Sequence, residues 1–153
     1  FVIRVPFRID TDRDSKVETG EKTEASIRGL HVLLAEDNEL NMEIAEFLLQ
    51  NEGADVTRAW NGQEAVEIFK KSRSGEFDVI LMDIMMPVMN GYEATKRIRS
   101  MDREDAKTIP IIAMTANAFT EDRLKAKKAG MNEHIAKPVD VKLLVKVVHE
   151  SLN

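Results

Sequence analysis

The sequence predicts an α/β protein, in which a doubly wound sheet of five parallel strands is covered by five helices. From residue 30 onward, short apolar runs alternate with amphipathic helical patterns, and strict alternation with right-handed crossovers places such strands in one parallel sheet. The third and fourth runs are almost entirely apolar, which is typical of strands that are covered on both faces. A chain of 153 residues has room for one such domain.

The strands are expected at the apolar runs, which are bounded by polar and turn-forming residues. They cover His31–Ala35, Asp55–Ala59, Val79–Asp83, Ile109–Met114 and Glu133–Ala136.

The first helix is expected over Glu39–Glu52, and Gly53 suits a left-handed cap at its end. The second helix begins at Asn61, with Glu64 completing a variant of the capping box. The remaining helices are expected over Tyr92–Ser100, Glu121–Ala129 and Asp140–Leu152. Periodicity predicts that the first helix buries Leu40, Ile44, Phe47 and Leu48, and the last one Leu144, Val148 and Leu152.

The first 29 residues have a different composition. Residues 1–10 alternate apolar and polar side chains, which predicts a half-buried strand, and Pro6 favours a sheet edge. Residues 11–29 are polar and charged and predict a linker, so the domain proper covers 30–153. Because a lone strand has no sheet of its own and the chain opens on Phe1, we expect a piece of a longer protein.

Composition excludes several classes of function. The net charge of −5 argues against a nucleic-acid groove as the main surface, and the absence of cysteine excludes disulfides and thiolate metal sites. No apolar run is long enough to span a bilayer, so we expect no membrane contact by this chain and a cytoplasmic location.

Ionisable and hydroxyl residues follow four of the five strands. Ligands of such sheets bind outside the carboxyl ends of the strands, at the switch point of strand order, and these residues should meet there. They are Glu36, Asp37 and Asn38 after the first strand, Asp83 at the end of the third, Thr115 after the fourth and Lys137 after the fifth.

Three carboxylates at one edge would raise each other's pKa unless a cation neutralised them. All-oxygen ligands favour a hard ion such as Mg²⁺. A site that only stores metal gains nothing from the ammonium of Lys137, whereas phosphoryl transfer requires a carboxylate, a metal, an ammonium and a hydroxyl together. Asp83 is then the expected nucleophile, which forms an aspartyl phosphate.

Other interpretations of these residues fit less well. Taken singly, each acidic residue could simply belong to a solvated loop. Thr115 alone could be a turn residue, and Lys137 alone could be an ordinary surface lysine. A phosphatase of the haloacid dehalogenase type needs a second acid two residues after its nucleophile, where this chain has Met85. An FMN site needs a phosphate loop after the first strand, where Glu36 and Asp37 would repel the phosphate.

Four segments carry a resemblance to a known family: HVLLAEDNELN, DVILMDIMMPVMNGYEA, PIIAMTANA and GMNEHIAKPV. Over Leu30–Leu152 the chain resembles the receiver domain of two-component response regulators. The resemblance implies a flavodoxin-like sheet of order 2-1-3-4-5. It also implies that the domain promotes its own phosphorylation and dephosphorylation on Asp83, with the phosphoryl group coming from a phosphohistidine on a kinase dimerisation domain or a histidine phosphotransfer domain.

The same resemblance assigns roles to single residues. Glu36, Asp37, Asp83 and the Met85 carbonyl would bind Mg²⁺ or Mn²⁺. Thr115 and Lys137 would bind the phosphoryl oxygens. Thr115 would also move in the switch step, together with an aromatic side chain at the position of His134. Because histidine departs from the common Tyr or Phe, we hold open both a pH-sensitive switch and an exposed histidine without a role.

The segment FVIRVPFRI is similar to the last strand of the ATP-binding domain of sensor histidine kinases. Joined to a receiver, it suggests that this chain is the C-terminal receiver of a hybrid histidine kinase. The resemblance is compatible both with a parent kinase that is anchored in a membrane and with one that is not. The alternatives are a stand-alone response regulator and a magnesium-dependent aspartyl-phosphate phosphatase. The resemblance leaves room for a homodimer, and a basic run is a candidate partner surface: Arg123, Lys125, Lys127 and Lys128.

Overall fold

The structure is a computed structural model that describes residues 27–115, 120–137 and 140–152. The expected strand at residues 1–10 and the expected linker up to residue 26 lie outside the described residues. Ile27, at the end of that expected linker, is buried and packs with the first helix of the domain. In the described part of the chain, no helix is long and apolar enough to cross a membrane.

A parallel sheet of order β2-β1-β3-β4-β5 forms the centre of the molecule, as predicted. β4 begins two residues later than expected, because Pro110 has no N–H to donate to a neighbouring strand. The strands are β1 (His31–Ala35), β2 (Asp55–Ala59), β3 (Val79–Asp83), β4 (Ile111–Thr115) and β5 (Glu133–Ala136).

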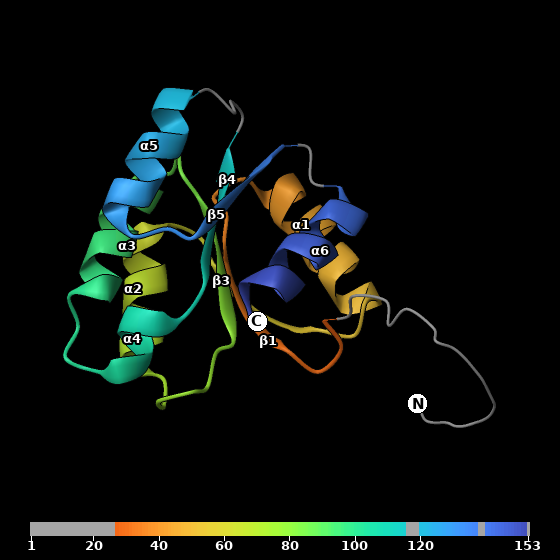
Figure 1. Cartoon of the computed structure of the whole chain (residues 1–153). Helices are drawn as coiled ribbons and strands as arrows, with labels where there is room; N and C mark the ends of the chain where they lie inside the picture. The colour runs from red at the N-terminus through yellow and green to blue at the C-terminus, as the bar shows by residue number, and fades with distance from the viewer. Residues whose placement is uncertain (1–26, 116–119, 138–139, 153) are drawn as a thin grey trace.

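Helices cover both faces of the sheet (Figure 1). One face carries α1 and α6, and the other carries α2, α3, α4 and α5 (Figure 1). The short helix α4 was not predicted, because a helix of five residues is too short to show an apolar period. The helices are α1 (Glu39–Asn51), α2 (Gly62–Lys71), α3 (Gly91–Arg99), α4 (Glu104–Thr108), α5 (Thr120–Ala129) and α6 (Val141–Ser151).

Helix α1 packs on the sheet with a different side from the predicted one. Its buried residues are Met42, Ala45 and Leu49, and the predicted stripe points away from them. Exposed fractions are 65% for Leu40, 48% for Ile44 and 66% for Phe47, and Leu48 is half-buried. The prediction was wrong because two apolar stripes share the helical period, and the short connection that Asn38 caps decides which of them meets the sheet.

One smaller prediction about burial is corrected as well. In α6 Leu144 and Val148 are buried as expected, but Leu152 lies beyond the end of the helix and is 41% exposed. Among the methionines near Asp83, Met82, Met86 and Met89 pack in the core, whereas Met85 is 77% exposed.

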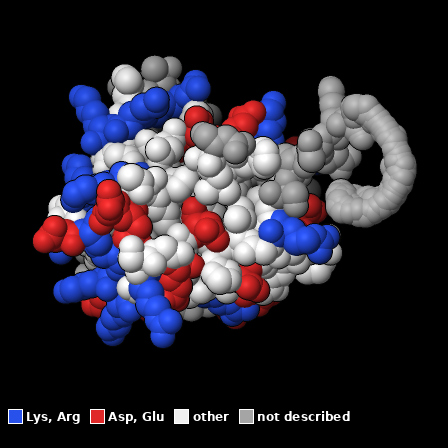
Figure 2. Space-filling view, turned by 60° about the horizontal axis from the view of Figure 1, so that its bottom comes forward, with Lys and Arg blue, Asp and Glu red and all other residues white. Residues whose placement is uncertain are grey.

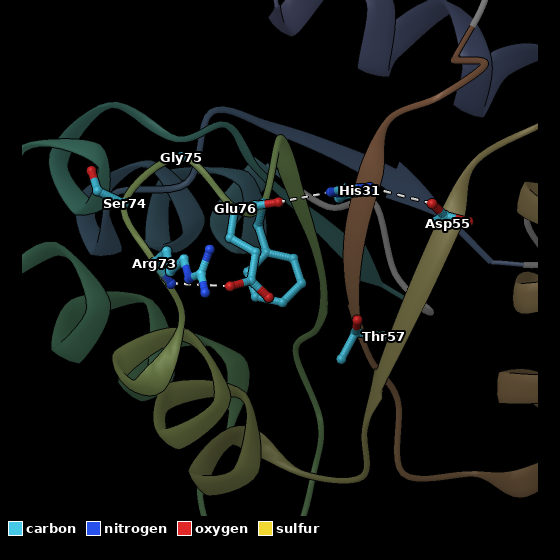
Figure 3. Close-up of a pocket in the computed structure, with 8 residues that line it drawn as sticks. His31, Asp55, Thr57, Arg73, Ser74, Gly75 and Glu76 are labelled. Atoms are coloured by element: carbon cyan, nitrogen blue, oxygen red, sulfur yellow. Dashed lines mark hydrogen bonds and ion pairs between the residues drawn. The ribbon is translucent and has the colours of Figure 1, made fainter.

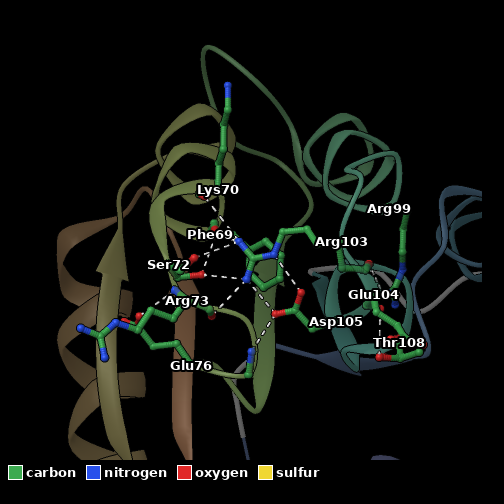
Figure 4. A network of polar contacts seen from close by, with 12 residues as sticks. Phe69, Lys70, Ser72, Arg73, Glu76, Arg99, Arg103, Glu104, Asp105 and Thr108 are labelled. Carbon is green, nitrogen blue, oxygen red and sulfur yellow. Dashed lines mark hydrogen bonds and ion pairs between the residues drawn. The ribbon is translucent and has the colours of Figure 1, made fainter.

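An arginine-centred network closes the end of the molecule where the strands begin (Figure 4). The Arg103 guanidinium donates to the Phe69 carbonyl at 2.7 Å and to the Ser72 and Arg73 carbonyls at 3.1 Å. It also holds both carboxylate oxygens of Asp105 at 2.8 Å and lies 4.5 Å over the Phe69 ring. One planar fork therefore caps the end of α2 and ties it to α4.

Candidate functional site

The acidic residues meet at the carboxyl ends of the strands. Glu36 and Asp37 follow β1 and Asp83 ends β3, which is the neighbour of β1 in the sheet. One carboxylate oxygen of each lies within 4.8 Å of the others. Glu36 and Asp83 are 2% and 4% exposed, whereas Asp37 is exposed. The structure thus brings together the three carboxylates that the sequence places at these strand ends.

Lys137 reaches this acidic cluster from the end of β5. Its Nζ lies 2.8 Å from Glu36 Oε1 and 3.1 Å from Asp83 Oδ2. Its backbone N–H donates to the Thr115 carbonyl at 2.8 Å, which fixes the start of the long side chain at the edge of β4. One ammonium therefore bridges two carboxylates that belong to neighbouring strands.

The electrostatics of the cluster favour a proton on Asp83. Burial and the nearby charge of Glu36 raise the pKa of Asp83 from 3.8 to about 7, against the opposing effect of Lys137. Burial lowers the pKa of the Lys137 ammonium, but its contacts with Glu36 and Asp83 outweigh burial, and the net shift is upward. Because one ammonium does not balance three carboxylates, the site has an unmet demand for positive charge.

Thr115 and Met85 are the two other residues that the sequence assigns to this site. Thr115 is the last residue of β4, the strand next to β3, and is 7% exposed. The Met85 side chain points to solvent, but its backbone N–H donates to Asp83 Oδ1 at 3.4 Å. Met85 therefore contacts the Asp83 carboxylate through its backbone N–H, and Thr115 ends the strand next to β3; the roles expected for the Met85 carbonyl and the Thr115 hydroxyl stay predictions.

The donor set fits a hard divalent cation. The three clustered groups offer only oxygen atoms, which are the ligands that Mg²⁺ prefers in proteins. Burial and the charge of Glu36 raise the pKa of Asp83, and a bound cation would offset both effects. Glu36, Asp37, Asp83 and the Met85 carbonyl are the groups that would hold it.

His134 does not belong to this cluster. It lies in the middle of β5, is half-buried and lines a hollow of about 260 Å³ between α5 and β5. Arg123 and Lys127 of the basic run line the same hollow, and all four basic residues of that run are exposed. The structure thus separates the expected switch residue from the acidic site by one strand.

A wider hollow lies at the opposite end of the sheet, away from the acidic cluster. Its volume is about 700 Å³, and β1, β2 and the loop after α2 line it (Figure 3). The His31 ring contacts the Glu76 carbonyl at 3.0 Å and Asp55 at 3.3 Å. Figure 2 shows this end of the molecule, where basic and acidic side chains lie side by side. This hollow has mixed charge and no cluster of metal-binding groups among the described residues.

Sequence reasoning missed one feature near the site, the contact of Gly62 with the loop that follows β3. The Gly62 N–H donates to the Met89 carbonyl at 3.0 Å. The pair Asn61–Gly62 signals a helix start, but a contact with a loop 27 positions away leaves no local pattern in the sequence.

Comparison with known proteins gives a consistent picture. The family model described as "Response regulator receiver domain" matches residues 32–149. Hybrid signal transduction histidine kinase I of Dictyostelium discoideum is 38% identical over 123 residues, which are 79% of this chain and 7% of that protein. Histidine kinase 1 of Arabidopsis thaliana is 35% identical and covers 83% of this chain. This chain spans 13% of the length of the Arabidopsis protein.

Two solved structures bear on the site. The receiver domain of the sensor histidine kinase PA1611 from Pseudomonas aeruginosa holds a magnesium ion in its active site cleft. It has a TM-score of 0.73 and 39% identity, and the match covers 81% of this chain and 98% of that one. The receiver of Saccharomyces cerevisiae Ssk1, solved with the phosphotransfer protein Ypd1, has a TM-score of 0.72 and 34% identity, covering 80% and 88%.

Proposed function

Because this chain belongs to the family of response regulator receiver domains, we propose that its Asp83 is the residue that accepts a phosphoryl group. The chain is a receiver domain of two-component phosphorelay signalling. The observation that carries the residue assignment is the meeting of three carboxylates and the Lys137 ammonium at one end of the sheet.

Asp83 has the position and environment of a nucleophile. One carboxylate oxygen would attack the phosphorus of a phosphohistidine while the P–N bond breaks and the electron pair returns to the imidazole. The carboxyl must be ionised to attack, and a pKa of about 7 leaves a substantial protonated fraction at neutral pH. Bound Mg²⁺ or Mn²⁺ would supply positive charge that lowers this pKa and aligns the phosphoryl oxygens.

Lys137 and Thr115 would bind the transferred group. In the unphosphorylated site the Lys137 ammonium pairs with Asp83 at 3.1 Å, and a short movement brings it to an oxygen of the new aspartyl phosphate. Thr115 ends the neighbouring strand, and its hydroxyl would donate to a phosphoryl oxygen. We further propose that Thr115 and His134 form the switch pair, and that His134 makes the switch pH-sensitive. Phosphorylation by acetyl phosphate and partner affinity should be measured from about pH 5.5 to 8 in the wild type and in His134→Tyr, and identical pH profiles would contradict the pH-sensitive switch.

The exposed face of α1 supports a protein as the donor. Leu40, Ile44 and Phe47 form an apolar stripe on the solvent side of a helix that begins three residues after Glu36. Glu43 and Glu46 lie along one edge of the stripe, near Arg58 of β2. A domain that presents a phosphohistidine within an apolar face with a basic rim would bind here beside Asp83. A kinase dimerisation domain or a histidine phosphotransfer domain has the required chemistry.

The parent protein is proposed to be a hybrid histidine kinase. The full-length relatives named above are histidine kinases of which this chain matches a small part. A cytoplasmic location is proposed with it, since a chain that has no cysteine and forms no disulfide fits a reducing compartment.

Acetyl phosphate, a small phosphoryl donor, tests the acceptor assignment without any partner. Incubation with Mg²⁺ should add one phosphoryl mass to the intact protein, and Asp83→Asn should remove that gain. Thr115→Ala should still gain the phosphoryl mass, but its aspartyl phosphate should be less stable than that of the wild type, because the Thr115 hydroxyl no longer binds a phosphoryl oxygen. A mass gain that persists in Asp83→Asn would refute the assignment.

A further inference from the structure

We propose that Gly62, the first residue of α2, is a positioning residue for the loop that follows Asp83. The loop spans residues 84–90 and joins β3 to α3. The proposal rests on the function proposed above, because the loop carries Met85, whose backbone lies against the Asp83 carboxylate.

The loop has a conformation that its own sequence does not favour. Val88 has φ of 68°, the one positive φ of a non-glycine residue in the described part of the chain. The Met89 N–H donates to the Pro87 carbonyl at 2.7 Å, so Val88 is the centre of a γ-turn, which is strained for a β-branched residue. The Val88 side chain is 81% exposed, and its own packing does not hold it there.

Contacts at both ends of the loop hold this conformation. The Gly91 N–H donates to the Ile84 carbonyl at 2.9 Å and closes the loop. Met86 and Met89 anchor the loop in the core. The Met89 carbonyl accepts the Gly62 N–H at 3.0 Å, and this N–H would lack a partner within its own helix. The start of α2 therefore fixes the Met89 peptide, and through the closed loop it fixes Met85.

The approach between α2 and the loop is closer than a side chain allows. A Cβ on Gly62 would lie 2.3 Å from the Met89 oxygen, 2.9 Å from its carbonyl carbon and 3.0 Å from the Asn90 oxygen. All three are backbone atoms, which cannot rotate away. Any other residue at position 62 would displace the loop. Once the loop is displaced, the backbone strain at Val88 favours a different loop conformation.

The decisive variant is Gly62→Ala, compared with Gly75→Ala. Gly75 also has a hydrogen-bonded N–H, but it lies in a turn at the opposite end of the sheet, and a Cβ there would meet nothing within 4 Å. Its φ of 82° makes Gly75→Ala destabilising through backbone strain alone. The pair therefore separates loss of stability from loss of positioning.

Mg²⁺ binding, followed by the fluorescence of Trp60, is the first measurement. We expect Gly62→Ala to bind Mg²⁺ about tenfold more weakly, as is typical when a group that orients a ligand is lost, and Gly75→Ala to bind like the wild type. Equal affinity in all three proteins would overturn the proposal. Absence of Mg²⁺ binding by the wild type would instead contradict the proposed function.

Amide hydrogen exchange in metal-free protein is the second measurement. Gly62→Ala should exchange faster over residues 84–91 than the wild type, and Gly75→Ala should not; unchanged exchange in Gly62→Ala would overturn the proposal without reference to any metal. If Gly62→Ala does not fold, the wild type still decides the matter. Mg²⁺ should slow exchange at the Gly62 amide and leave the Gly75 amide unchanged, and equal behaviour of both amides contradicts the coupling.

Discussion

The two ends of the sheet shift the pKa of a buried or half-buried aspartate in opposite directions. At the carboxyl end, burial and Glu36 raise the pKa of Asp83 to about 7. At the amino end, hydrogen bonds from Arg103 hold the pKa of Asp105 below its usual value, and Asp105 in turn raises the pKa of Arg103. One aspartate lacks enough positive charge and the other has a dedicated partner. The carboxylate that lacks enough positive charge lies at the end proposed to bind metal and react, and the carboxylate with a dedicated partner lies at the end where Arg103 ties α2 to α4.

The strongest test of this comparison removes the satisfied partner. Arg103→Ala should lower the free energy of unfolding by about 3 kcal/mol, because Asp105 loses its partner and the end of α2 loses its cap. Arg103→Lys should recover little, since an ammonium cannot reproduce the fork. Urea denaturation measures both, and phosphorylation of Asp83 by acetyl phosphate should stay unchanged. A stability loss below about 1 kcal/mol would show that the network is ordinary surface pairing.

The second test removes the charge of Asp83 with the substitution Asp83→Asn. The folded pKa of Asp83, about 7, exceeds its ordinary value of 3.8, so ionisation favours the unfolded chain as pH rises through this interval. Metal-free wild type should therefore lose stability relative to Asp83→Asn between about pH 4 and 7. Above pH 7 the variant should be more stable by roughly 2–4 kcal/mol, and near pH 4 the two should be equal. Thermal unfolding in EDTA across this range gives the answer, and parallel curves would contradict it.

A third test asks whether every unsatisfied polar group marks function. The Thr95 hydroxyl in α3 is fully buried and has no hydrogen-bond partner in the described structure. It is a neutral group away from the converging charges, so we expect it to be a cost without a role. Thr95→Val should raise the free energy of unfolding by about 1 kcal/mol and leave phosphorylation unaffected. If a stable Thr95→Val protein were no longer phosphorylated, the Thr95 hydroxyl would have a functional role, contrary to this expectation.

The smallest effect on stability is expected on the outer face of α1. Phe47→Ser should change the free energy of unfolding by no more than about 0.5 kcal/mol, since the side chain is 66% exposed. Phosphotransfer from a phosphorylated histidine phosphotransfer domain should slow, whereas labelling by acetyl phosphate should not. Met42→Ala, on the buried side of the same helix, should instead cost about 2–5 kcal/mol. Equal transfer rates for Phe47→Ser and wild type would remove α1 from the docking surface.

Much of the fold could be predicted because its signals are local. The apolar runs located all five strands to within two residues, and the order of the sheet followed from the family resemblance. Helix α4 could not be predicted because five residues show no apolar period, and the buried stripe of α1 could not be predicted because two apolar stripes share the helical period. Arg103 holds α4 in place through the end of α2, more than 30 positions earlier, and the sheet selects Met42 over the larger Phe47.

The residues of the site could be predicted from the sequence, but the electrostatic effect of Lys137 on the buried carboxylates could not. Strand ends placed Glu36, Asp83 and Lys137 at one edge of the sheet, because parallel strands all end on the same side. That Lys137 bridges the two buried carboxylates, and still leaves the pKa of Asp83 high, is a property of distances and burial. The loop contact at Gly62 was missed for the same reason.

The raised pKa of Asp83 also has a consequence for metal binding near neutral pH. A cation that binds an acidic group with a pKa near 7 displaces its proton, so Mg²⁺ association at neutral pH should release a fraction of a proton for each ion bound. The heat measured on titration would then include the heat with which the buffer takes up that proton. Comparison of two buffers with different protonation enthalpies would count the protons, and would measure the ionisation of Asp83 without any phosphoryl donor.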